Sequence, residues 1–183
     1  MNEKNLSKSD SGQSYCTFHC GDVVCGIPVE KVREIVSNLA LTPVPRSSDF
    51  IAGLVNLRGQ ILTVVDMMHW LHRDRQTRLP ASRFYLIAEV GSEAISLQVD
   101  EMGPVISTDD YVLEPVPKHM ERIVADRIQS VARLSDQLVL ILKIEKLREI
   151  RSLTSAAYFS VGNRNIDNDN VQDVGHREHQ DIQ

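Results

Sequence analysis

The sequence predicts a mainly β protein, built of small barrels or a sandwich with a few short helices. Two observations lead to this fold class. Short apolar segments recur in pairs around tight-turn residues, and no helical segment is long enough to connect parallel strands. The predicted strands are residues 15–20, 23–29, 54–57, 61–65, 84–90, 94–99, 127–134 and 138–144.

Turn residues between the paired strands support their assignment as hairpins. The connections at residues 21–22, 58–60 and 91–92 each contain a glycine. Gly59 in particular can adopt the positive φ angle that a tight turn needs. We therefore expect each pair of strands to be antiparallel.

The strand at residues 94–99 has the clearest alternation. Ile95, Leu97 and Val99 alternate with polar residues at positions 96, 98 and 100. A period of two is typical of a strand with one buried face, so the polar residues should face solvent.

Three short helices are predicted, at residues 30–36, 67–71 and 145–150. The first follows Pro28 and places Val32, Ile35 and Val36 on one helical stripe. The second follows the strand that ends before Asp66, and the third closes the folded region.

Composition divides the 183 residues into one folded region and two tails. With 42% hydrophobic and 25% charged residues, the chain is typical of a globular protein. We expect a flexible N-terminal tail at residues 1–14, a folded domain at 15–150, and a polar, largely disordered extension at 151–183. Within that extension, residues 153–159 are apolar enough to be a short docking segment.

Charge and hydropathy exclude several classes of function. The net charge of -5 gives no long-range attraction for a phosphate backbone, and no basic-aromatic strand face is present, so we expect no nucleic-acid partner. No apolar stretch suits a secretory signal or a membrane span. We expect a cytoplasmic protein without direct membrane insertion.

Three cysteines lie close together near the start of the folded region. Cys16, Cys20 and Cys25, with His19, could form a metal site or a thiol redox sensor. On a strand, however, Cys16 and Cys20 face away from His19, and the spacing is looser than zinc sites favour. We therefore favour small buried side chains and predict neither a metal nor a cofactor.

Motifs of enzymes are missing from the sequence. It contains no GxxxxGK or GxGxxG loop for phosphates and no GxSxG nucleophile turn, and its carboxylates are scattered. We predict that the protein is not an enzyme.

Residues 51–66 form the most distinctive segment. Two apolar strands enclose a turn that holds Arg58, and Asp66 follows the second strand. We interpret Arg58 as the lone cation of its neighbourhood. Its guanidinium is placed where it could donate two parallel hydrogen bonds to a carboxylate or contact a partner. The alternative is an ordinary solvated charge on a turn.

Five ordered blocks stand out along the chain, at residues 26–35, 42–45, 51–66, 97–102 and 140–147. In these blocks, within about residues 15–150, the sequence resembles the CheW family, the adaptor proteins of bacterial chemotaxis.

This resemblance implies two interleaved SH3-like five-stranded β-barrels, packed on each other over a shared apolar core. It also implies a non-enzymatic function. A member of the family couples the cytoplasmic tip of a chemoreceptor (a methyl-accepting chemotaxis protein) to the regulatory domain of the histidine kinase CheA. Receptor state then controls kinase activity within an array at the membrane.

By position, the resemblance implies coupling roles for Arg58, Glu34, Val32, Asn56 and Gly59. We predict an ion pair between Glu34 and Arg58, joining the predicted first helix to the hairpin. The sequence departs from the family pattern at two places, where Ser130 and Lys143 stand instead of the usual glycine and aspartate. These changes put in question which pathway the protein serves and how it contacts the kinase, rather than the fold.

Overall fold

The computed structural model describes residues 12–71, 84–107, 110–148 and 150. The expected tails, residues 1–14 and 151–183, lie outside the described residues except for 12–14. No helix in the described part has the length and apolar character that crossing a membrane requires.

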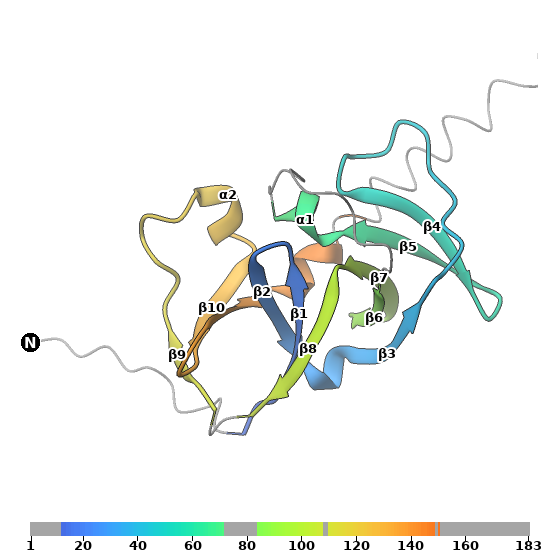
Figure 1. Cartoon of the computed structure of the whole chain (residues 1–183). Helices are drawn as coiled ribbons and strands as arrows, with labels where there is room; N and C mark the ends of the chain where they lie inside the picture. Colours follow the sequence, from blue (N-terminus) through green and yellow to red (C-terminus); the bar gives the residue numbers. More distant parts are fainter. Residues whose placement is uncertain (1–11, 72–83, 108–109, 149, 151–183) are drawn as a thin grey trace, which may run out of the picture.

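The described residues contain eleven strands in two separate sheets, which Figure 1 shows toward the left and the right of the molecule. The first sheet has six strands in the order β8-β1-β2-β11-β10-β9. Its strands are β1 (Tyr15–Cys20), β2 (Val23–Pro28), β8 (Glu101–Ile106), β9 (Val112–Glu114), β10 (Ile128–Arg133) and β11 (Leu138–Leu142).

The second sheet has five strands in the order β3-β6-β7-β5-β4. Its strands are β3 (Val32–Ser37), β4 (Ile51–Leu57), β5 (Gln60–Asp66), β6 (Phe84–Val90) and β7 (Glu93–Val99). All five lie between β2 and β8 in the chain, which confirms the interleaved two-unit fold. The first sheet differs from the expected five strands because the short β9 pairs with β10.

The segment after β3 reaches across the second sheet to its opposite edge. Thr42 and Leu54 form an isolated antiparallel bridge, in which each backbone N–H donates to the other residue's carbonyl oxygen at 2.8 Å. Because β3 and β4 are the two edges of this sheet, the bridge covers the free edge of β4.

One apolar core joins the two sheets, and each sheet adds a smaller cluster of its own. The shared core contains Phe18 and Cys25 from the first sheet, Leu86 and Leu97 from the second, and Trp70 from the short helix α1 (Met67–Trp70). Burial of this surface between the sheets holds them together as a single body.

Both faces of β7 are buried, so the predicted solvent-facing side is wrong. Ser96 is 0% exposed and Gln98 is 1% exposed. The strand lies in the middle of its sheet, between β6 and β5, and the sheet is covered on both sides. The alternation of apolar and polar residues in this strand therefore distinguishes two buried faces, not a buried face and a solvent-exposed one.

Ser96 leads to a test of stability. Its hydroxyl is buried and has no hydrogen-bond partner among the described residues, so Ser96→Ala should raise the free energy of unfolding by up to about 1 kcal/mol. Thr17→Val is the matched control, because the buried Thr17 hydroxyl donates to the Pro104 carbonyl at 2.5 Å. That variant should lose about 1 kcal/mol in urea unfolding. Equal losses in both variants would contradict the assignment.

The predicted helix at residues 30–36 is wrong. A single 3-10 turn, η1 (Val29–Lys31), is followed by β3, which pairs antiparallel with β6. Val32, Ile35 and Val36 are β-branched and favour an extended backbone, so their spacing imitated a helical stripe.

The other helix predictions are closer to the structure. At α1, Asp66 caps the helix by accepting a hydrogen bond from the His69 N–H at 3.2 Å. Near residue 145 the chain forms the 3-10 helix η2 (Ile144–Leu147). The sequence reading missed α2 (Arg122–Ala125), β8 and β9.

Candidate functional site

A two-residue turn joins β4 to β5 at the tip of their hairpin. Leu57 pairs with Gln60, and the residues between them, Arg58 and Gly59, have φ angles of 52° and 87°. Two positive φ angles are the mark of a type I′ turn, whose twist matches that of antiparallel strands. The expected positive φ at Gly59 is confirmed, whereas Gln60 belongs to β5 rather than to the turn.

Asn56 holds this turn in shape. Its side-chain Oδ1 accepts a hydrogen bond from the Gly59 backbone N–H at 2.8 Å. The bond satisfies a donor at the tip and stabilises a conformation that costs a non-glycine residue such as Arg58 about 1 kcal/mol. Asn56 and Gly59 therefore act on the site through the backbone.

The predicted ion pair between Glu34 and Arg58 is confirmed. Arg58 Nη2 lies 2.9 Å from Glu34 Oε2, and Nη1 donates to Oε1 at 3.3 Å. Two parallel contacts make the pair bidentate, which orients the planar guanidinium. Glu34 presents its carboxylate from strand β3, however, and not from a helix.

The pair is open to solvent, with the Arg58 side chain 78% exposed and that of Glu34 23% exposed. A pair with so much contact with water contributes at most about 1 kcal/mol to stability. Its main effect is to fix where the positive charge stands.

A second cation reaches the same hairpin tip, so the interpretation of Arg58 as a lone cation is wrong. Arg33, next to Glu34 on β3, donates from Nη1 to Gln60 Oε1 at 3.3 Å. Sequence reasoning missed this residue because the contact depends on how β3 lies against the hairpin.

We call the group formed by Arg33, Glu34, Arg58 and Gln60 the β3–hairpin surface. It combines two guanidinium groups, one carboxylate and one side-chain amide. Arginine is enriched at protein-binding surfaces, so this group is a candidate contact for a partner.

Val32, the remaining predicted site residue, directly precedes Arg33 on β3. It is partly buried and packs against the shared core. Two positions depart from the family pattern. The buried Ser130 hydroxyl has no hydrogen-bond partner within the part of the chain that the structure describes, and Lys143 donates to the Asp126 carbonyl at 3.3 Å.

The three cysteines are free and buried, as the sequence predicts. A hydrogen bond with Cys25 and burial raise the pKa of the Cys20 thiol well above its usual value. Among the described residues, no group of three or more His, Cys, Asp or Glu side chains could hold a metal ion. The cluster fills the core between the sheets.

The raised pKa of Cys20 predicts slow thiol chemistry in the folded protein. At pH 8, Ellman's reagent should react with Cys20 about 100-fold more slowly in the native state than in guanidinium chloride, because the reactive thiolate is disfavoured and enclosed. As pH rises past about 8.5, the unfolded chain should release protons that the native state keeps, so stability falls. Rapid native-state labelling of Cys20 would contradict this expectation.

Comparisons with known proteins give a consistent result. The family model described as a CheW-like domain matches residues 14–151. Chemotaxis protein CheW of Klebsiella aerogenes is 24% identical over 142 residues, covering 78% of this chain and 85% of that protein. Chemotaxis protein CheW of Rhizobium meliloti is 29% identical over 126 residues, covering 68% and 77%.

One solved structure has a similar fold. The crystal structure of scaffolding protein TtCheW from Thermoanaerobacter tengcongensis matches with a TM-score of 0.66 at 24% sequence identity. The match covers 76% of this chain and 94% of that one. All strands of both sheets fall within residues 14–151, the range that the family model matches.

Proposed function

The chain belongs to the family of CheW-like domains, and from this membership we infer that it is a chemotaxis adaptor. We propose that it connects the cytoplasmic tip of a chemoreceptor to the regulatory domain of a CheA-type histidine kinase. Receptor state would pass to the kinase through these two contacts. The protein would perform no bond-making itself, and it would be cytoplasmic, held at receptor arrays.

The observation that carries this proposal is the extent of the family match, which includes the strands of both sheets. An adaptor needs two binding surfaces held in a constant relation. A core shared between the sheets provides this rigidity, because residues of both sheets are buried against each other.

We propose the β3–hairpin surface as the receptor-coupling contact. Arg58 stands at the tip of a tight turn, and Glu34 orients its guanidinium. The solvent-exposed edge of this guanidinium can therefore contact a partner. Asn56 and Gly59 set the turn, and Val32 sets the position of β3. Because oriented charges determine specificity more than raw affinity, loss of Arg58 should affect coupling more than folding.

A reconstitution tests the function as a whole. The purified full chain, a CheA-type kinase and a chemoreceptor cytoplasmic fragment are mixed, and kinase autophosphorylation is measured with and without the chain. We expect the chain to bind each partner separately and to make kinase activity depend on the receptor. If neither partner binds, the proposed function is wrong.

A further inference from the structure

Strand β3 contains a β-bulge at Arg33. The residues before and after it, Val32 and Glu34, pair with two consecutive residues of β6, so Arg33 is an extra residue in this ladder. Successive residues of a regular strand point to opposite faces of the sheet, and a bulge changes the direction of the side chains beside it. The bulge therefore explains why the consecutive residues Arg33 and Glu34 both reach the same hairpin tip.

Two side-chain contacts join β3 to this tip, and they run in opposite directions. Arg33 Nη1 donates from β3 to Gln60 Oε1 of the hairpin at 3.3 Å. Arg58 Nη2 of the hairpin lies 2.9 Å from Glu34 Oε2 of β3. Because positions 58 and 60 lie on either side of Gly59, β3 holds both arms of the hairpin.

Backbone hydrogen bonds of the sheet do not set the distance between β3 and the hairpin. In the order β3-β6-β7-β5-β4, two strands separate β3 from β5, and β3 and β4 are opposite edges. Side chains therefore decide how closely the tip approaches β3. One exposed ion pair contributes at most about 1 kcal/mol, so the pair of Glu34 and Arg58 holds the tip weakly by itself. A second contact beside it restricts the same backbone and side-chain freedom, which the pair would otherwise have to restrict alone.

We propose that Arg33 and Gln60 are positioning residues for Arg58. Their hydrogen bond fixes the tip at the distance from β3 at which Glu34 can accept two bonds from the Arg58 guanidinium. The bulge supplies the backbone geometry, because it lets neighbouring residues of one strand offer a donor and an acceptor to the same tip. The consequence for coupling rests on the proposed function, whereas the ordering of Arg58 does not.

The mobility of the Arg58 guanidinium tests the positioning without any partner. NMR relaxation of its Nε–H group in the labelled full chain gives an order parameter, and Arg58→Ala identifies the signal by its absence. We expect a value above about 0.6 in the unaltered chain and below about 0.6 in both Gln60→Ala and Arg33→Ala. Gln60→Glu keeps an acceptor for Arg33 and should therefore keep the unaltered value.

Receptor-dependent kinase activity then tests the consequence for coupling. Gln60→Ala leaves the net charge of the surface unchanged, yet it should weaken receptor control of the kinase about threefold, because Arg58 is oriented for less of the time. Gln129→Ala is the matched control, since it makes the same change at an exposed position of β10 in the other sheet. Both variants should keep the unaltered unfolding midpoint.

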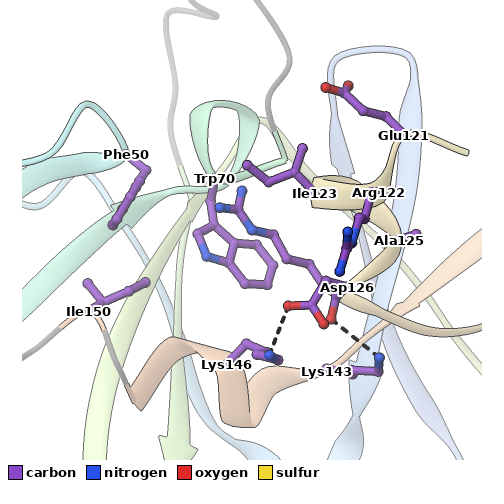
Figure 2. A pocket seen from close by; sticks show the side chains of 11 residues that line it. Phe50, Trp70, Glu121, Arg122, Ile123, Ala125, Asp126, Lys143, Lys146 and Ile150 are labelled. Carbon is purple, nitrogen blue, oxygen red and sulfur yellow. Dashed lines mark hydrogen bonds and ion pairs between the residues drawn. The ribbon is translucent and has the colours of Figure 1, made fainter.

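Arg122 provides the matched control for the loss of an exposed arginine. It lines a cleft of about 990 Å³, which Figure 2 shows with Trp70 in its centre, at the end of the molecule that carries α1 and α2. Among the described residues, the lining of this cleft has no member in common with the β3–hairpin surface. Arg122→Ala should therefore leave the order parameter of Arg58 unchanged.

Three results would overturn the proposal. The first is an unchanged order parameter of Arg58 in Gln60→Ala. The second is a decrease in Arg33→Ala alone, which would show that the charge of Arg33 acts rather than its contact. The third is a lowered unfolding midpoint in Gln60→Ala, which would assign the contact to folding. If the order parameter falls as expected but the unaltered chain binds neither partner, the positioning stands and the proposed adaptor function is wrong.

Discussion

Replacing Arg58 with alanine is expected to reduce receptor control of the kinase about tenfold while leaving the fold intact. The side chain is 78% exposed and its pair with Glu34 adds at most about 1 kcal/mol to stability, so little folding energy depends on it. A tenfold loss corresponds to about 1.4 kcal/mol of coupling, which is reasonable for one oriented guanidinium at a binding surface. The measurement is receptor-dependent kinase activity, with urea unfolding in parallel.

Two further variants separate the charge of Arg58 from its orientation. Arg58→Lys keeps the charge but cannot form the bidentate contact with Glu34, so it should recover only part of the control. Arg33→Ala removes the neighbouring cation, whose contact is a single bond to Gln60, and should have the smaller effect. Equal losses in Arg33→Ala and Arg58→Ala would mean that only net charge matters. Unfolding of Arg58→Ala would contradict its assignment to binding.

Replacing Gly53 with alanine is expected to destabilise the protein by about 3 kcal/mol. Gly53 has a φ angle of 151°, and a Cβ atom there would overlap the Thr42 carbonyl oxygen. That oxygen accepts the Leu54 N–H in the bridge that covers the edge of β4. The clash is with backbone, so it cannot be relieved by turning a side chain.

Gly59→Ala is the control for the backbone angle alone. Gly59 also has a positive φ, 87°, but a Cβ atom there would meet nothing within 4 Å. This variant should lose only about 1 kcal/mol. Urea unfolding of both variants measures the difference of about 2 kcal/mol that the clash contributes. Similar losses of unfolding free energy in the two variants would show that the backbone at Thr42 shifts at little cost to accommodate the added Cβ atom.

The sequence predicted the strands well where a turn signal separated two apolar runs. Strands β1 and β6 have the predicted bounds, and the other predicted strands are shifted by at most three residues at either end. Strand β8 was missed because it contains Gly103 and Pro104, residues that ordinarily argue against a strand. Strand β9 has only three residues, too few to show a period.

The candidate site was predicted in part. Arg58 could be selected from the sequence because it stands on a turn between two apolar strands, and the family resemblance pointed to Glu34. Arg33 could not be selected, because nothing near it in the chain shows that β3 lies against the hairpin tip. The cleft around Trp70 is also invisible in the sequence, since its walls come from four separate segments.

Local patterns by themselves determined that this chain is mainly β, that its strands pair as hairpins, and that the positive φ at the tip falls on Gly59. These features depend on neighbours in sequence, whose steric and hydrogen-bonding preferences act over a few residues. Only the tertiary structure decided that residues 32–37 are a strand rather than a helix, that Ser96 is buried, and that Arg33 shares the tip with Arg58. Each of these depends on which sheet face or hairpin covers the residue, and contacts between distant segments settle that.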